Sequence, residues 1–332
     1  MTCKTVSIVI ATRNEKKHIK TCLVSIAKQT YPLSLVSVVV VDGKSNDKTV
    51  EIVKKFSQQN PKINLKLLTN PKQIAPTAFN IGIKATNSDS VIILGAHSSV
   101  DKNFVSEGIK VLNAMPEVVC VGGPIKSIGQ GFVGQTIALA MGSRFASGSS
   151  FRFSQKAKYV DTVAFGAYRR SIFKQVGYFD EKLIKNQDYE FNRRIIAKNK
   201  KIYLTPKIQS SYYVRSSIKK LAKQYFGYGF WKVTVLRKNK SFLAPRQLAP
   251  LALLATLMIT FILGFAFVTF KALFIVIALL YLTTSLIFAL KLTRQTKKVI
   301  LLMSSFAAMH FSFAVGFLFG LIKWHKSANK CK

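Results

Sequence analysis

The sequence is poor in carboxylates. Its 13 Asp and Glu residues are outnumbered by 50 Lys and Arg residues in a chain of 332, so the formal net charge is +37. Hydrophobic residues nevertheless make up 49% of the chain, and disorder requires a low hydrophobic content together with a high net charge. The composition therefore excludes a disordered chain. The length allows one large domain or two small ones.

Cysteines are also few, and they lie far apart. The four are Cys3, Cys22, Cys120 and Cys331. Their spacing fits neither a disulfide framework nor a metal site. We therefore expect reduced thiols, as in a protein that faces the cytosol.

The carboxylates are absent from the C-terminal part of the chain. All 13 lie in residues 1–190, whereas residues 191–332 contain 24 Lys and Arg and no Asp or Glu. Any carboxylate chemistry must therefore lie in the first part. The second part is suited to an anionic partner, which is nucleic acid, phosphate groups or a lipid surface.

Strand and helix patterns alternate in the first part. Strands are predicted at 6–11, 36–42, 63–68 and 91–94, and helices at 19–27, 48–58 and 76–85. The β-branched run at 36–42 is typical of a parallel strand that is covered on both faces. Short connections predict an α/β fold with an open, mostly parallel sheet flanked by helices. The first apolar run is too short for a signal peptide.

Glycine and serine are concentrated in residues 122–150. This composition predicts a mobile loop that contacts the substrate. The alternative is a flexible connection without a function of its own.

Polar residues follow the first two predicted strands. Arg13, Asn14 and Glu15 follow the first, and Asp42 ends the second. Open α/β sheets bind ligands at the carboxyl ends of their strands. We therefore expect these side chains to line a crevice and to bind a base and ribose hydroxyls. Asp42 by itself is equally suited to form a turn or cap a helix.

Several motifs together resemble one enzyme family. They read S-I-V-I-A-T-R-N-E, V-V-V-V-D-G-K-S-N-D-K-T, A-F-N-I-G-I, F-G-A-Y-R-R-S-I-F, V-G-Y-F-D-E and N-Q-D-Y-E-F-N-R-R, in that order along the chain. Over roughly residues 5–235 the sequence resembles the family 2 inverting glycosyltransferases with a GT-A fold. With its hydrophobic C-terminus it most resembles the membrane-anchored branch that contains succinoglycan glucosyltransferases.

The resemblance implies roles for individual residues. The nucleotide-sugar would be bound by Thr12, Arg13, Glu15, Asp42, Asn80, Gly82 and Gly95. Asp188 matches the catalytic base, which takes a proton from the acceptor hydroxyl. The acceptor side would hold Glu190, Gln224 and Trp231. Asp180 and Glu181 are expected to stabilise a turn or a helix start.

The sequence departs from the family at its usual metal site. The strand that corresponds to 91–94 usually ends in an Asp-x-Asp motif, which binds a divalent cation, but here it is followed by Gly95, Ala96 and His97. His97 remains a candidate ligand for Mn²⁺ or Mg²⁺, because imidazole binds such metals. The alternative is that Lys and Arg side chains do part of the work of the metal.

Three long apolar segments lie near the C-terminus. They cover about 248–270, 272–290 and 299–322, and a helix of about 20 residues spans a bilayer. We therefore predict a cytosolic domain over 1–230 and a multi-pass membrane region over 231–332. An excess of Lys and Arg on the cytosolic side favours two crossings. The third segment is either a further crossing or a re-entrant or interfacial helix.

Residues 215–240 combine Lys and Arg with Tyr, Phe and Trp. This pattern suits a nucleic-acid surface or a segment at the lipid headgroups. The adjoining apolar segments favour an anionic membrane surface, so we expect no nucleic-acid partner.

Together these patterns predict a glycosyltransferase of the cell membrane. It would move a sugar from a nucleotide diphosphate sugar, UDP-linked in our prediction, to a lipid-linked saccharide or polyprenyl phosphate. The alternative is a non-catalytic, membrane-anchored nucleotide-binding or assembly module with the same fold. The sequence does not predict an oligomeric state.

Overall fold

The computed structural model describes residues 4–147, 150–152, 154–238, 243 and 245–328. The chain divides into two compact units. The first consists of Met1–Lys126 and Phe153–Tyr213, and the second of Ser127–Arg152 and Val214–Lys332. The predicted domain boundary at residue 230 falls inside a continuous helix, α9 (Ile218–Lys238).

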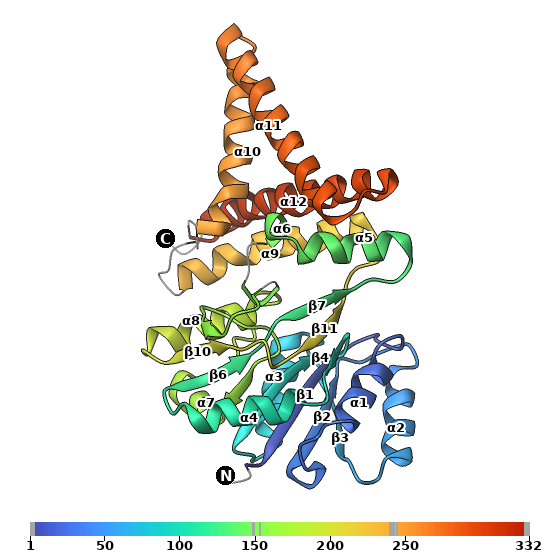
Figure 1. Ribbon diagram of the computed structural model, residues 1–332. Helices are drawn as coiled ribbons and strands as arrows, with labels where there is room; N and C mark the ends of the chain where they lie inside the picture. The colour runs from blue at the N-terminus through green and yellow to red at the C-terminus, as the bar shows by residue number, and fades with distance from the viewer. Residues whose placement is uncertain (1–3, 148–149, 153, 239–242, 244, 329–332) are drawn as a thin grey trace. The chain divides into compact units, whose positions relative to one another are not determined.

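The first unit is built on an eight-stranded sheet with the order β3-β2-β1-β4-β9-β6-β10-β8 (Figure 1). Four parallel neighbours come from the N-terminal part: β1 (Val6–Thr12), β2 (Val36–Asp42), β3 (Asn64–Thr69) and β4 (Ser90–Gly95). The others are β6 (Val118–Gly122), β8 (Lys158–Tyr159), β9 (Ala167–Arg169) and β10 (Lys201–Leu204). Because β8 and β9 are antiparallel to their neighbours, the sheet is mostly parallel, as predicted.

Helices cover both faces of this sheet. They are α1 (Ile19–Ala27), α2 (Thr49–Gln59), α3 (Ala75–Lys84), α4 (Phe104–Ala114), α7 (Ser171–Val176) and α8 (Gln187–Ala197). Side chains alternate across a strand, so Ile8 and Ile10 of β1 share a core cluster with α1, α2 and α4. Val9 points to the other face and meets α3. The predicted strands and helices up to residue 95 are confirmed to within one residue at each end.

A smaller sheet has the order β5-β11-β7. It consists of β5 (Ser98–Val100), β11 (Ser210–Tyr213) and β7 (Ile125–Ile128). The division between the two units runs through β7. β5 begins just after the carboxyl end of β4, so the smaller sheet starts beside the predicted ligand crevice.

The glycine-rich stretch 122–150 is not the predicted loop or flexible connection. Its described residues include β7, α5 (Gly131–Gly142) and α6 (Arg144–Ser147). Ile137, Ala140 and Met141 of α5 are fully buried. The prediction was wrong because apolar residues recur at helical spacing between the glycines, and their burial outweighs the low helix propensity of glycine.

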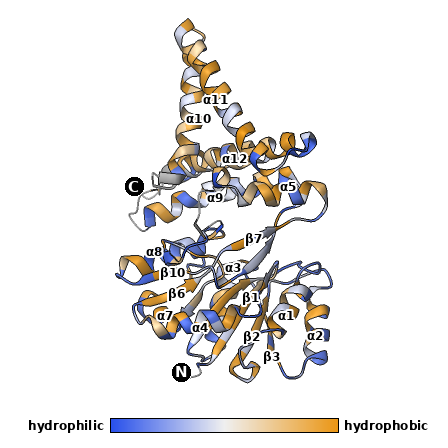
Figure 2. Ribbon diagram, viewed as in Figure 1, coloured by the Kyte–Doolittle hydropathy of each residue, from blue (hydrophilic) through white to orange (hydrophobic). Residues whose placement is uncertain are grey.

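The second unit is helical. Beside α5 and α6 it contains α9, α10 (Pro245–Leu263), α11 (Val268–Leu292) and α12 (Thr296–Ala328). α10 and α11 form an antiparallel hairpin whose residues are strongly hydrophobic (Figure 2). At the turn of the hairpin, Phe265 is 80% exposed and Val268 is 82% exposed.

All three predicted membrane segments have different bounds in the structure, where they correspond to α10, α11 and α12. The first ends at Leu263 and not at residue 270, because the chain turns at Gly264, where a Cβ would lie only 3.1 Å from Lys271 Cα. In the described part of the chain, Val268–Leu292 and Thr296–Lys323 are long and apolar enough to cross a membrane. Gln247–Leu263 is a shorter apolar helix.

Helices α9 and α12 approach each other closely through glycine. A Cβ at Gly229 would overlap the carbonyl of Phe313, and a Cβ at Gly316 would overlap the carbonyl of Phe226. At Gly320 a Cβ would lie 2.7 Å from the carbonyl oxygen of Phe230. Small residues at this spacing let two helix backbones pack directly.

Candidate functional site

The loops after β1, β2 and β3 meet at the carboxyl end of the sheet. Each contains one non-glycine residue in the left-handed backbone region: Asn14 (φ 55°), Lys44 (φ 56°) and Gln73 (φ 60°). Such residues are uncommon, and they gather at binding and catalytic sites. A Cβ on Gly43 would lie 3.3 Å from Arg13 Cβ and 3.4 Å from Gln73 Cα, so glycine lets the three loops converge.

Asp42 ends β2 and is 5% exposed. Its Oδ2 accepts a hydrogen bond from Ser45 N at 2.8 Å, and its Oδ1 accepts one from Ser45 Oγ at 2.5 Å. Ser45 Oγ in turn accepts a hydrogen bond from Asn14 N at 2.8 Å. Asp42 therefore forms a turn, as one of the two readings predicted, and its contact with a nucleotide stays a prediction.

Thr12 lies beside Asp42, because the two residues are paired in the register of β1 and β2. Its backbone carbonyl accepts a hydrogen bond from Gly43 N at 2.8 Å. Its Oγ1 is buried and has no hydrogen-bond partner in the described part of the chain. Buried hydroxyls are normally hydrogen-bonded, so this unpaired hydroxyl marks the strand ends beside Asp42 as a candidate ligand site.

Glu15 and His97 form a pair at the ends of β1 and β4. His97 Nδ1 lies 2.9 Å from Glu15 Oε1. An ionised carboxylate can only accept, so the hydrogen of this bond is on Nδ1 of His97, and Nε2 is the ring nitrogen that the bond to Glu15 does not use. Tyr212 of β11 packs edge-on against the His97 ring at 5.0 Å.

This pair matches one feature of protein metal sites. A ligating histidine usually donates its other ring N–H to a carboxylate, which orients the ring. In the described residues no group of three or more His, Cys, Asp and Glu could hold a metal ion. Mg²⁺-type sites often use one or two protein ligands and complete their shell with phosphate oxygens and water. The residues therefore fit a cation held jointly with a diphosphate, and not one held by the protein alone.

Asn80 and Gly82 are both buried on α3. A Cβ on Gly82 would overlap Val9 Cγ1, so this glycine lets α3 pack directly on β1. Asn80 is 5% exposed and hydrogen-bonds to Phe179 and Glu181. Their predicted contact with the nucleotide-sugar stays a prediction. Gly95, the last residue of β4, lies against the His97 ring.

Asp188 and Glu190 lie in the first turn of α8 but in different surroundings. Asp188 is exposed, and its Oδ1 accepts a hydrogen bond from Tyr189 N at 2.8 Å. Glu190 is fully buried, and its two carboxylate oxygens accept hydrogen bonds from Arg194 at 2.9 Å each. An acceptor could reach Glu190 only if this ion pair broke. Asp188 has the exposure that a base for a bound acceptor needs.

Gln224 and Trp231 lie on α9 in the second unit. Gln224 is buried and its Nε2 donates to Tyr228 Oη at 2.7 Å. Trp231 is half-buried and packs edge-on against Phe230 at 5.6 Å. Their acceptor-side role stays a prediction.

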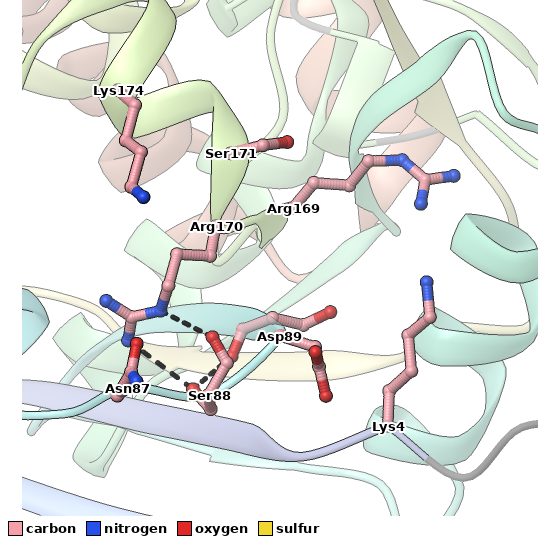
Figure 3. Close-up of a pocket in the computed structure, with 9 residues that line it drawn as sticks. Lys4, Asn87, Ser88, Asp89, Arg169, Arg170, Ser171 and Lys174 are labelled. Carbon is pink, nitrogen blue, oxygen red and sulfur yellow. Dashed lines mark hydrogen bonds between the residues drawn. The ribbon is translucent and has the colours of Figure 1, made fainter.

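A basic pocket lies at the opposite ends of the strands, near the starts of β1 and β4 (Figure 3). Its arginines are occupied by backbone carbonyls: Arg169 Nε donates to Val118 O at 2.8 Å, and Arg170 Nη1 donates to Ile83 O at 3.1 Å. Asp89 accepts from Thr5 N at 2.9 Å. The pocket residues therefore mainly join loops to the sheet.

Sequence reasoning missed several neighbours of the site. Tyr212 reaches His97 only because β11 pairs with β5, and Tyr213 stacks on the His18 ring at 4.6 Å. Lys72 follows β3 and forms an ion pair with Glu181. No local sequence pattern predicts these contacts, since each joins segments that are far apart in the sequence.

Comparison with known proteins identifies relatives of the chain. The profile of "Glycosyl transferase family 2" matches residues 7–177. A dolichyl N-acetyl-α-D-glucosaminyl phosphate 3-β-D-2,3-diacetamido-2,3-dideoxy-β-D-glucuronosyltransferase of Methanococcus voltae is 36% identical over 70% of this chain and 74% of its own length. The succinoglycan biosynthesis protein ExoA of Rhizobium meliloti is 28% identical over 74% of both chains.

Solved structures share the fold. The mannosyltransferase PcManGT of Pyrobaculum calidifontis, in complex with GDP-Man and Mn²⁺, matches with a TM-score of 0.69 at 18% identity over 96% of this chain and 87% of its own. S. aureus TarS 1–349 in complex with UDP-GlcNAc matches with a TM-score of 0.52 at 17% identity, over 95% and 90% of the two chains. Both support the GT-A-type architecture of the sheet.

Proposed function

The chain belongs to glycosyl transferase family 2 and is therefore a glycosyltransferase. We propose that it transfers its sugar with inversion of the configuration at the anomeric carbon. The donor is a nucleotide diphosphate sugar, and the acceptor is a lipid-linked saccharide or polyprenyl phosphate. The observation that carries this proposal is the convergence of three loops around Asp42, each with one residue in the left-handed backbone region. Beside them lies the buried Thr12 hydroxyl, which has no hydrogen-bond partner in the described part of the chain.

The nucleotide binds at the carboxyl ends of β1, β2 and β4. Thr12 offers a free hydroxyl, Asp42 retains lone pairs beyond those that Ser45 uses, and Arg13 supplies a cation beside Gly43. This combination suits ribose hydroxyls and phosphates. Solved structures with the same fold bind UDP-GlcNAc and GDP-Man, which supports a nucleotide-sugar donor.

Asp188 is the catalytic base. With a lipid-linked saccharide as the acceptor, its hydroxyl oxygen attacks the anomeric carbon, and the proton of that hydroxyl passes to the Asp188 carboxylate. The bond from the anomeric carbon to the diphosphate oxygen breaks, and its electron pair leaves with the nucleoside diphosphate. Attack opposite the leaving group inverts the anomeric centre.

His97, oriented by Glu15, would hold a divalent cation at the diphosphate of the donor. With Glu15 on Nδ1, the Nε2 atom of His97 is the ring nitrogen that would hold a divalent cation. When bound, such a cation neutralises charge on the departing diphosphate. PcManGT is solved with Mn²⁺, which supports this role.

The second unit attaches the enzyme to an anionic membrane. It contains no Asp or Glu, and α10 and α11 expose large apolar side chains. At 1.5 Å per residue, the apolar part of α10, Gln247–Leu263, reaches about 25 Å, at the lower end of the lengths that span a bilayer. The named relative from Methanococcus voltae acts on a dolichyl phosphate sugar, which supports a membrane-bound acceptor.

Helix α12 is proposed to lie at the membrane interface with α9. In the most apolar stretch of α12, 44% of the residues are buried within the protein, whereas only 11% are buried in the corresponding stretch of α11. His310 ties it to its neighbours, with Nδ1 3.1 Å from Tyr281 Oη and Nε2 2.8 Å from Phe145 O. With the catalytic unit in the cytosol, α10 and α11 then make the two crossings.

A donor and acceptor screen tests the proposed reaction. Membranes that contain the full-length protein are supplied with a panel of UDP- and GDP-sugars, together with dolichyl phosphate or dolichyl N-acetylglucosaminyl phosphate. We expect one donor to release its nucleoside diphosphate in step with a glycosylated lipid. A nucleotide-binding module would bind UDP or GDP and form no product with any pair, which would refute the proposal.

Cysteine labelling tests the proposed topology. Phe265→Cys at the hairpin turn is made in a Cys3→Ser, Cys331→Ser background, where Cys22 and Cys120 are fully buried. We expect a membrane-impermeant maleimide to label it from outside intact cells. Labelling from the cytosolic side alone would overturn this topology.

A further inference from the structure

A polar cluster joins three segments of the first unit. We call Lys72, Asn80 and Glu181 the Glu181 cluster. Lys72 Nζ donates to Glu181 Oε2 at 2.7 Å, and Asn80 Nδ2 donates to Glu181 Oε1 at 3.0 Å. Hydrogen bonds from Lys72 and Asn80 lower the pKa of Glu181 to about 2, so its carboxylate is ionised at neutral pH.

The Asn80 amide is fully engaged by the segment around Phe179. Its Oδ1 accepts from Phe179 N at 3.0 Å, and its Nδ2 donates to Phe179 O at 2.9 Å as well as to Glu181. An amide nitrogen has two hydrogens, and both are used here. Asn80 therefore binds a loop of the protein and has no hydrogen left for a sugar.

Helix α8 holds the same segment from the other side. Arg194, which is paired with Glu190, donates to Tyr178 O at 2.8 Å and also to Val176 O. Between the two helices the Phe179 ring packs 5.4 Å from Phe79 and 4.6 Å from Phe191. Residues 176–181 are thus fixed to both α3 and α8.

The Glu181 cluster is also connected to the carboxyl ends of β1 and β2, where the nucleotide is proposed to bind. Gly82 packs α3 directly on β1. Lys72 N donates to Asn70 Oδ1 at 3.1 Å, and Asn70 N donates to Asp42 O at 2.7 Å. The Glu181 cluster therefore connects the strand ends that carry Thr12 and Asp42 with the segment that leads into α8.

We propose that Asn80 and Glu181 are positioning residues for the transfer reaction: they fix the start of α8, and with it Asp188, relative to the nucleotide end of the sheet. Asp188 follows Glu181 by seven residues. The proposal rests on the proposed function of Asp188 as the base. Lys72 closes the cluster from the solvent side.

The test compares Glu181→Ala, Asn80→Ala and Lys72→Met in the full-length, membrane-bound protein. Displacing a reacting group by a fraction of an ångström lowers turnover, so we expect kcat to fall about 10- to 100-fold for Glu181→Ala and Asn80→Ala, and less for the exposed Lys72. Donor KM and the affinity for UDP or GDP should change less than about twofold, since the strand ends are untouched. Glu117→Gln, at an exposed carboxylate just before β6, is the matched control.

Hydrogen–deuterium exchange supplies a readout that does not depend on activity. In the Glu181 and Asn80 variants the amides of residues 176–190 should exchange faster, while those of residues 12–15 and 42–49 exchange as in the wild type. Because Lys72→Met changes an exposed side chain, it tests the cluster even if Asn80→Ala does not fold.

Two results would overturn the proposal. A weaker donor affinity in Asn80→Ala with unchanged kcat would mean that Asn80 contacts the donor directly. Unchanged kcat and unchanged exchange in Glu181→Ala would mean that the cluster positions nothing. Full turnover of Asp188→Asn would instead refute the base itself, and the exchange result would still report on the cluster.

Discussion

The first unit holds all 13 carboxylates of the chain, whereas the second unit holds none. In the first unit the β-branched side chains of the central strands are buried beneath helices. In the second unit apolar side chains such as Phe265 and Val268 are largely exposed. Exposed apolar surface of this extent marks an interaction site. The difference teaches that the carboxylates and the exposed apolar surface belong to separate parts of this glycosyltransferase.

The largest expected effect is a loss of sugar transfer when Asp188 of the first unit is replaced. Asp188→Asn removes the proton acceptor, so transfer should fall on the order of 10²- to 10⁴-fold. UDP or GDP affinity should stay within about twofold of wild type, because the loops after β1 and β2 are unchanged. Glu107→Gln on α4 is the control. Near-wild-type turnover of Asp188→Asn would remove this residue from its proposed role.

The next effect concerns the support of His97 by Glu15. Glu15→Gln replaces an acceptor-only group with an amide and weakens the orientation of the ring. The affinity of a nucleoside diphosphate in the presence of Mn²⁺ should fall about 10- to 100-fold, with a smaller change in the absence of Mn²⁺. Calorimetric titration with UDP and GDP measures both. Equal losses with and without Mn²⁺ would argue against a cation at this pair.

The second unit should be most sensitive where α9 and α12 touch. Gly229→Ala places a Cβ against the backbone of Phe313, and overpacking of this kind costs about 1–3 kcal/mol. Gly142→Ala is the control, since a Cβ there meets nothing within 4 Å. Thermal unfolding in detergent should show a lower midpoint for Gly229→Ala alone. Equal midpoints for the two variants would contradict the close packing.

The smallest effect is a pH dependence in the first unit. The pKa of Glu181 is lowered to about 2, against about 4.3 for an unfolded Glu. Its stabilising contribution is therefore present above pH 4.3 and is lost as the pH falls toward about 2. Because the carboxylate is partly exposed, the loss should stay below about 1 kcal/mol. Glu181→Gln should lack this part of the acid dependence in thermal unfolding; an unchanged acid dependence would contradict it.

Much of the first unit could be predicted from its sequence. The β-branched run Val38–Val41 and the apolar spacing of Ile19, Leu23 and Ile26 each determine one element through local burial, and the structure agrees. Helix α5 was missed because its glycines suggested a loop. The Glu15–His97 pair and the Glu181 cluster could not be predicted, since they join residues 82 and 109 positions apart. Tertiary packing alone brings such residues together.

The predicted membrane segments show a second limit of the sequence. Apolar length together with the charge distribution predicted two crossings and a third segment that either crosses or is re-entrant or interfacial, but Gly264 ends the first segment early and glycines let α12 pack along α9. Hydropathy indicates that the side chains of a segment are removed from water, but it does not indicate whether lipid or other parts of the protein cover them. Glycine positions within an apolar run carry that information.

The most direct test of the account is the anomeric configuration of the product. The full-length enzyme is given its α-linked nucleotide sugar and a dolichyl-linked acceptor, and the new linkage is determined by NMR. Transfer by a single attack with Asp188 as the base predicts a β-linked sugar on the lipid. An α-linked product would contradict the inverting mechanism.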